Sequence, residues 1–143
     1  MRYLYSLLLV PVLVACSGTV DLLVSGDANT GIIFELSERD AKRLDSGFRF
    51  YVMDNSAVPT GEFKKTVWEI EISRKLSWFD FKNDYTQKWT YGVKPSGFEE
   101  TVKPQQLKLN TQYLYWVSGG AGYRGGGCFY LNDNKMVVDD KNC

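Results

Sequence analysis

Alternation of apolar and polar residues is the feature that most constrains the fold of this chain. Trp68, Ile70 and Ile72 alternate with two glutamates, and the same period of two runs through residues 48–53. Because successive side chains of a strand point to opposite faces of a sheet, this spacing predicts half-buried β-strands rather than helices. The apolar side chains are expected to face a core and the glutamates to face water.

Eight further segments have the composition of short strands, and turn-forming residues separate several of them. These segments are 20–24, 32–36, 76–81, 88–92, 106–109, 113–118, 128–131 and 136–138. The asparagine and aspartate residues of 132–134 predict a tight turn between the last two. Many short strands joined by turns are typical of antiparallel sandwiches and barrels. We therefore predict a mostly β, single-domain antiparallel β-sandwich, with a small β-barrel as the alternative.

Residues 37–44 carry the signals of a short helix. Ser37 is suited to cap the first turn, and Gly47 follows the last one. A charged loop is the alternative for this segment. The fold should therefore contain at most one short helix.

One local motif narrows the type of sandwich. Segment 109–117 reads Leu-Asn-Thr-Gln-Tyr-Leu-Tyr-Trp-Val. It resembles the leucine, turn and tyrosine that open a late strand in fibronectin type III and related immunoglobulin-like domains. In those families the tyrosine hydroxyl bonds back to the backbone of the corner. The resemblance implies an immunoglobulin-like sandwich and this role for Tyr113, and it implies no activity.

The start of the chain has the pattern of a bacterial signal peptide. Arg2 supplies a positive charge, and residues 4–15 are nearly all apolar. This run is shorter than the ~20 residues that a membrane-spanning helix needs. Leu13-Val14-Ala15-Cys16 resembles the lipobox that the lipoprotein-processing peptidase recognises, although an ordinary secretory leader or a first strand is the alternative.

The lipobox resemblance implies that Cys16 becomes the first mature residue and carries the lipid. Several acyl chains would attach the protein stably, since a single chain gives only marginal binding. Ser17, rather than aspartate, follows the cysteine, which favours the outer membrane. We therefore expect a bacterial envelope lipoprotein, anchored in the outer membrane and facing the periplasm.

This interpretation divides the chain into three parts. Residues 1–15 are predicted to be a cleaved signal peptide, residues 16–19 a short lipid tether, and residues 20–143 the sandwich domain. A linker of three residues spans at most ~10 Å. The folded domain should therefore lie close to the lipid headgroups.

The two remaining cysteines, Cys128 and Cys143, are predicted to form a disulfide in an oxidising compartment. Closing a loop of this length should stabilise the fold by ~3 kcal/mol. Two free thiols are the alternative. Two cysteines without any histidine make a poor zinc site, so we predict no metal and no cofactor.

The chain contains no histidine, which removes the Ser-His-Asp and Cys-His mechanisms. Its 17 basic residues balance its 17 acidic ones, which argues against a nucleic-acid partner. We therefore predict that the protein is not an enzyme and binds no nucleic acid.

Carboxylate pairs are the remaining candidates for catalysis. Glu69 and Glu71 are expected to point to water, and the adjacent pairs at 99–100 and 139–140 to point to opposite faces. None has the separation across a cleft that sugar hydrolysis requires. The aromatic residues between 78 and 98 are expected to be core rather than an exposed, sugar-stacking row.

Segment 119–127 contains six glycines among nine residues, and we expect it to be a loop between the last two long strands. Tyr123 and Arg124 at its tip belong to residue types enriched at interface hot spots, so they are the predicted partner contact. A mobile hairpin connection without a partner is the alternative.

The sequence therefore predicts a lipid-anchored, non-catalytic binding or assembly accessory with a protein partner. An immunity or inhibitor lipoprotein that neutralises a secreted toxin or hydrolase is the alternative. An envelope hydrolase that uses carboxylates is a weaker alternative.

Overall fold

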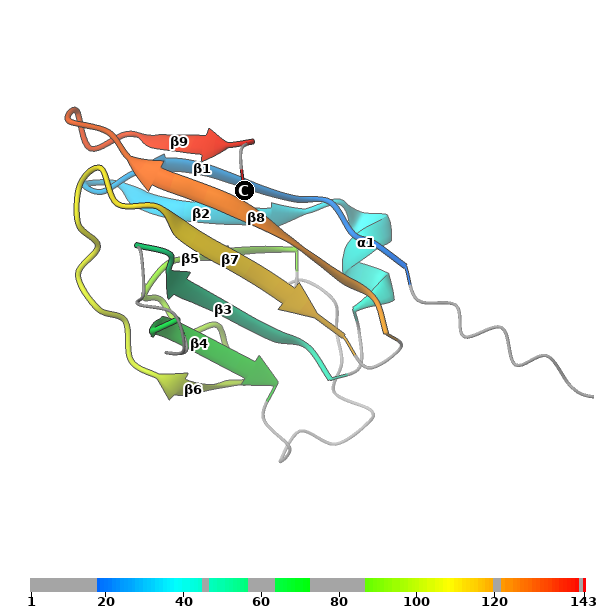
Figure 1. The fold of residues 1–143 in the computed structure, drawn as a ribbon. Coiled ribbons are helices and arrows are strands. Elements are labelled where there is room, and N and C mark those ends of the chain that lie inside the picture. Colours follow the sequence, from blue (N-terminus) through cyan, green and yellow to red (C-terminus); the bar gives the residue numbers. More distant parts are fainter. Residues whose placement is uncertain (1–17, 45–46, 57–63, 73–86, 120–121, 142) are drawn as a thin grey trace, which may run out of the picture.

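The computed structural model describes residues 18–44, 47–56, 64–72, 87–119, 122–141 and 143, which form two antiparallel sheets (Figure 1). Within these residues the strands are β1 (Leu22–Asp27), β2 (Gly31–Leu36), β3 (Arg49–Asp54), β4 (Thr66–Ile72), β5 (Lys88–Thr90), β6 (Phe98–Val102), β7 (Tyr113–Ser118), β8 (Arg124–Leu131) and β9 (Val137–Asp140). The helix is α1 (Glu38–Arg43). The predicted mostly β sandwich with one short helix is confirmed.

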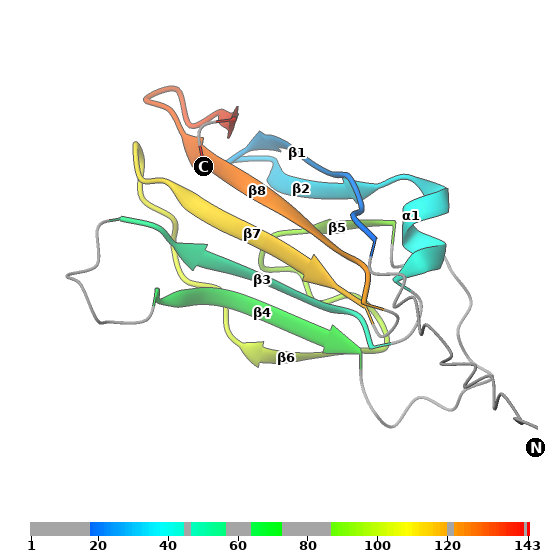
Figure 2. The same ribbon diagram turned by 45° about the vertical axis from the view of Figure 1, so that its right-hand side comes forward.

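The two sheets have the strand order of an immunoglobulin-like domain. The smaller sheet has the order β1-β2-β5 and the larger one the order β6-β4-β3-β7-β8-β9. In the smaller sheet, β1, β2 and β5 take the places of strands A, B and E. In the larger sheet, β3, β7 and β8 take the places of strands C, F and G. Each of these strands then has the same neighbours as in an immunoglobulin-like domain. Strand β4 then takes the C′ place, and β6 and β9 extend the two edges of the larger sheet. Figure 2 shows the smaller sheet behind the larger one, with α1 at the end where β8 begins.

The tyrosine corner lies at the start of β7. The hydroxyl of Tyr113 accepts a hydrogen bond from the backbone N–H of Lys108 at 2.9 Å. Burial of the ring raises the pKa of the Tyr113 hydroxyl. The role that the family resemblance implied for Tyr113 is therefore confirmed.

The substitution Tyr113→Phe is expected to lower the free energy of unfolding by about 1 kcal/mol. It keeps the ring but leaves the N–H of Lys108 without its acceptor. Urea denaturation of both proteins measures the difference. The matched control is Tyr130→Phe, which removes a hydroxyl from a half-buried position of β8. Equal losses in the two variants would contradict a specific role for the corner.

The core between the sheets is built largely from aromatic rings. Phe34 of β2 lies 4.7 Å from Phe50 of β3 and 5.5 Å from Tyr115 of β7, measured between ring centroids. Tyr115 follows Tyr113 by two residues, which is where antibody domains place the second cysteine of their inter-sheet disulfide. Here the ring pair of Phe34 and Tyr115 joins the sheets instead.

Helix α1 forms as its capping signals predicted. The Ser37 hydroxyl accepts a hydrogen bond from the N–H of Asp40 at 3.1 Å. The Asp40 side chain is 3% exposed, pairs with Arg43 at 3.3 Å and accepts from the N–H of Asp21 at 3.2 Å. These contacts attach the helix to the residue that precedes β1. Within the described residues, no helix is long and apolar enough to cross a membrane.

One strand prediction is wrong, and one strand was missed. Segment 106–109 is not a strand, because it turns into the corner and makes only an isolated bridge between Leu109 and Leu131. Strand β6, which pairs with β4, was not predicted. The predicted strand at 76–81 lies outside the described residues. The predicted turn at 132–134 is confirmed, since the Asn132 side chain accepts from the N–H groups of Asn134 and Met136 at 3.0 Å.

The glycine-rich segment is only partly a loop, which corrects the prediction. Gly125, Gly126 and Gly127 lie inside β8. A Cβ atom on Gly125 would overlap the carbonyl oxygen of Val20. Glycine is therefore required because the backbone of Val20, just before β1, lies directly against β8, a contact that sequence composition does not reveal.

Candidate functional site

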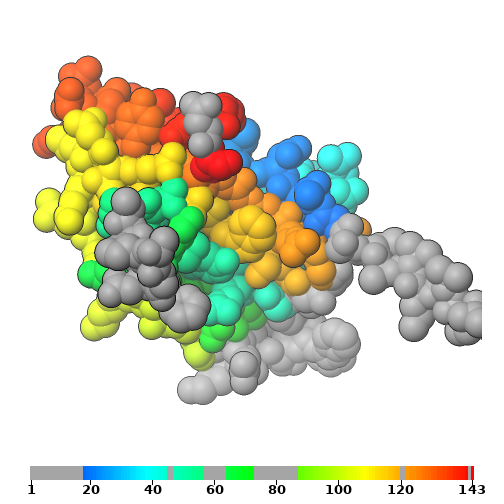
Figure 3. Space-filling model, in the orientation of Figure 1, coloured from blue at the N-terminus to red at the C-terminus, as the bar shows by residue number. Residues whose placement is uncertain are grey.

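The outer face of the larger sheet carries an exposed cluster of an indole, a phenol and a guanidinium group. Trp116 of β7 is 37% exposed and lies directly across from Tyr51 of β3. The Arg49 guanidinium lies 5.9 Å from the centroid of the Tyr51 ring. We call Arg49, Tyr51 and Trp116 the Trp116 platform. Figure 3 shows this face of the molecule, with β3, β7 and β8 side by side.

Gly126 lies next to the Trp116 side chain on the outer face of the sheet. The two residues are paired in register between β7 and β8. A Cβ atom on Gly126 would lie 2.9 Å from Cε3 of the indole. The ring therefore lies against the β8 backbone.

Arg49 connects the platform to a buried carboxylate. Its Nε donates to Oε1 of Glu69 at 2.5 Å, and this hydrogen bond raises the pKa of Arg49. Glu69 is only 8% exposed, so the prediction that it points freely into water is wrong. It does lie on the outer face, but the paired guanidinium takes the place of water.

A groove opens where β1 separates from the larger sheet. Before β1, Val20 N–H donates to the carbonyl of Arg124 at 3.0 Å, and after β1, Ala28 N–H donates to the carbonyl of Lys135 at 2.9 Å. Between these two points lies a cavity with a volume of about 690 Å³. We call it the β1–β9 groove; its lining residues are 20–23, 35–37, 126–127 and 139–141 together with Tyr115 and Cys143.

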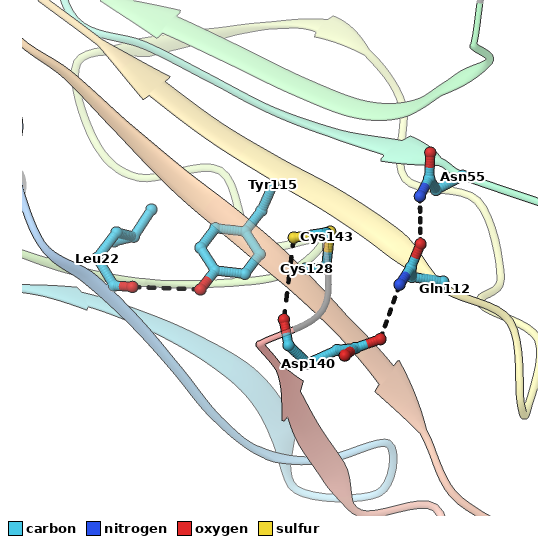
Figure 4. Close-up of a disulfide and its surroundings, with 7 residues drawn as sticks. All are labelled: Leu22, Asn55, Gln112, Tyr115, Cys128, Asp140 and Cys143. Carbon is cyan, nitrogen blue, oxygen red and sulfur yellow. Dashed lines mark hydrogen bonds between the residues drawn. A yellow bond between two sulfur atoms is a disulfide. The ribbon is translucent and has the colours of Figure 1, made fainter.

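Tyr115 reaches into the groove from the core. Its hydroxyl donates to the carbonyl of Leu22 at 3.3 Å (Figure 4). Burial raises its pKa to about 12, so the hydroxyl stays protonated at neutral pH. A Cβ atom on Gly127 would lie 2.7 Å from this oxygen, so glycine makes room for the tyrosine.

The predicted disulfide between Cys128 and Cys143 is present at one end of the groove. The two Cα atoms lie 5.9 Å apart. Nearby, the Gln112 side-chain amide donates to Asp140 Oδ2 at 2.7 Å (Figure 4). The disulfide attaches the C-terminus to β8, and this hydrogen bond attaches β9 to the residue that precedes β7.

A second cavity, of about 450 Å³, lies at the end of the sandwich away from α1. It is bordered by Ile32, Tyr91 and Leu131 and by residues 105–107. The Tyr91 hydroxyl donates to the carbonyl of Gln105 at 2.7 Å. Burial raises the pKa of this hydroxyl well above its usual value.

The predicted contact residues Tyr123 and Arg124 lie beside Gly18, the first residue that the structure describes. Tyr123 is half-buried against the core, and its ring centroid lies 5.4 Å from the Arg43 guanidinium. Arg124 has an exposed side chain, and its N–H donates to the carbonyl of Gly18 at 3.0 Å. Their contact with a partner stays a prediction. Cys16 lies outside the described residues.

The sequence reasoning missed Trp116, although the signal was present. Tyr113, Tyr115 and Val117 face the core, so the period of two directs Trp116 outward. Trp89 and Phe98 are buried, as predicted for the aromatic segment 78–98. Tyr91 is partly buried against the core, and the rings at 78, 79, 81 and 85 lie outside the described residues.

No three His, Cys, Asp or Glu residues gather into a possible metal site in the part of the chain that the structure describes. No protein-family model matches the chain, and no curated protein and no solved structure matches it either.

Proposed function

We propose that this protein is a non-catalytic binding accessory of the bacterial envelope, anchored by a lipid on Cys16, whose protein partner contacts the Trp116 platform. The observation that carries the proposal is the exposed indole of Trp116 beside Tyr51 and Arg49. Tryptophan, tyrosine and arginine are the residues most enriched at binding hot spots. An indole that rests on glycine backbone is also held in one orientation, so little entropy is lost on binding.

The proposed anchor would orient the domain on the membrane. Gly18 bonds to Arg124, and Cys16 precedes Gly18 by two residues, which span at most about 7 Å. The end with Tyr123, Arg124 and α1 would therefore meet the lipid headgroups. In this orientation the Trp116 platform lies on a side face of the domain, where a periplasmic protein can reach it.

The substitution Trp116→Ala is expected to weaken partner binding by about 2 kcal/mol, or roughly 30-fold in Kd. The partner is first isolated from solubilised envelope with the full-length protein, and its Kd is then measured for each variant. Leu23→Ala is the matched control, because Leu23 is apolar and 64% exposed on the other sheet.

The same assay compares the platform with the predicted loop contact. If Tyr123→Ala and Arg124→Ala abolish binding while Trp116→Ala does not, the partner binds at Tyr123 and Arg124. The proposal that it contacts the Trp116 platform is then wrong. If the captured partner is a toxin or hydrolase that the protein inhibits, the immunity alternative replaces the accessory function.

Mass spectrometry of protein purified from its host tests the anchor. The expected product begins at Cys16 with acyl groups on that residue, and Cys16→Ser is expected to release the protein from the membrane fraction. An intact Met1 would contradict the lipid anchor without affecting the platform.

A further inference from the structure

At every second residue of β1, the backbone N–H and C=O groups point away from β2. On β2, the carbonyl of Ile32 accepts from Tyr91 N–H at 2.8 Å, and the N–H of Leu36 donates to Gln87 at 2.7 Å, so the even-numbered residues bond toward β5. Because backbone groups alternate in direction along a strand, the odd-numbered residues of β2 bond toward β1. The register then directs the backbone groups of Leu22 and Val24 away from β2, and Leu22 lines the groove. The Leu22 carbonyl already accepts from the Tyr115 hydroxyl, which leaves the Leu22 N–H and the groups of Val24 on this edge.

On β9 too, alternate residues have backbone groups that point away from the neighbouring strand, which here is β8. Asn132 N–H donates to the carbonyl of Met136 at 3.0 Å, which makes the even-numbered residues of β9 the ones that bond to β8. The backbone groups of Val137 and Asp139 therefore face away from β8. The two edges meet at the bridge between Asp27 and Met136 and separate toward Cys143.

The groove between these edges has the dimensions of a ligand site. Its volume of about 690 Å³ falls within the range of typical binding pockets, which is roughly 300–1,000 Å³. The open part of β1 can pair with about five residues of an extended chain, at about 3.3 Å per residue. A strand edge without a neighbouring strand, beside a groove, is a feature that proteins use to recognise extended peptides.

The carboxylates that line the groove favour a peptide with basic side chains. The groove lining includes the carboxylates of Asp21, Glu35, Asp139 and Asp140. Glu35 pairs with Lys88 at 3.9 Å, and Asp139 pairs with Lys141, so the carboxylates outnumber the ammonium groups near the groove by four to two. The apolar side chain of Leu23 is exposed beside them. A segment in which basic and apolar residues alternate complements both features.

We propose that the β1–β9 groove binds an extended, basic peptide segment, which adds a strand to the free edge of β1. This site is separate from the Trp116 platform and does not depend on the lipid anchor. The peptide's backbone bonds to the Leu22 N–H and to Val24 supply affinity, and its basic side chains interact with the groove carboxylates, which gives sequence preference.

Fluorescence anisotropy with synthetic peptides tests the proposal on the full-length protein in detergent. The probe is a labelled Lys-Val-Lys-Val-Lys-Val-Lys peptide, and the matched control is Glu-Val-Glu-Val-Glu-Val-Glu. We expect the basic peptide to bind at least tenfold more tightly at low salt, and its advantage to shrink as salt is added. Absence of binding, or equal binding of the two peptides, would overturn the proposal.

Backbone methylation separates strand addition from attraction by charge alone. N-methylation of alternate residues gives two peptides of equal charge, and only one of them loses the N–H groups that face β1. We expect one methylated peptide to bind at least tenfold more weakly and the other to bind as the parent does. Equal binding of the two methylated peptides would show that no strand is added.

Two measurements on the protein locate the peptide. The variant with both Glu35→Gln and Asp139→Asn is expected to bind the basic peptide at least fivefold more weakly, whereas Glu71→Gln on the outer face should bind it normally. Hydrogen exchange at the Val24 N–H should slow at least tenfold on binding. An unchanged Val24 exchange rate, or dimerisation of the protein through this edge, would contradict the site.

Discussion

Replacing Phe34 by alanine is expected to lower the free energy of unfolding by about 4 kcal/mol, the largest single effect that we predict. Phe34 is 0% exposed, and its ring contacts Phe50, Tyr115, Phe129 and Trp89 at centroid distances between 4.7 and 6.2 Å. Those four rings come from strands of both sheets. The alanine variant therefore opens a cavity where the sheets are joined, and no neighbouring element can move in without separating from its own sheet.

Denaturation by urea, followed by tryptophan fluorescence, measures this loss. Leu23→Ala is the control, because it removes a side chain of similar size from a 64% exposed position on the neighbouring strand. The control is expected to change stability by less than about 0.5 kcal/mol. A loss below about 2 kcal/mol for Phe34→Ala would contradict the central role of this ring, because buried phenylalanines typically cost more.

Removal of the disulfide is expected to produce the second largest effect, a loss of about 3 kcal/mol. The bond joins cysteines separated by 15 residues and closes the loop that contains the β8–β9 hairpin. Without the bond, the unfolded chain gains entropy, and the C-terminus is released from β8. Cys143→Ser tests this expectation in urea, with and without a reductant.

Measuring both proteins with and without reductant separates the effect of losing the disulfide from the effect of replacing the Cys143 side chain. Reductant should destabilise the unmodified protein by the same amount as Cys143→Ser does, and it should leave that variant unchanged. A variant that responds further to reductant would contradict the pairing of Cys128 with Cys143. Loss of the bond should also weaken binding of the basic peptide, because Asp139 and Cys143 line the groove that would receive it.

Local patterns were sufficient for much of the fold. The alternation around Trp68 and Ile70 predicted which side chains face the core, and the motif around Tyr113 predicted the hydrogen bond of the corner. The Ser37 cap and the Cys128–Cys143 bond were predicted in the same way. These features depend on residues that are near in sequence or on one simple pairing of cysteines.

The surfaces that we propose for binding could not be predicted with the same success. Tyr123 and Arg124 have residue types that suggested a contact, but Tyr123 packs against Arg43 and the core. The groove exists because the segment around Val20 crosses to β8 before β1 joins β2. Such a crossing depends on the approach of segments about 100 residues apart, which no local pattern encodes.

The sequence by itself determined the β character of the chain, the inward and outward faces of its central strands and the pairing of its last two cysteines. Only the tertiary structure decided that Gly125–Gly127 form a strand, that Glu69 is buried beneath Arg49, and that β1 leaves an open edge beside β9. The physical reason is that side-chain periodicity acts within one strand. Close backbone approach and burial of an outer face, by contrast, arise only when distant strands pack together.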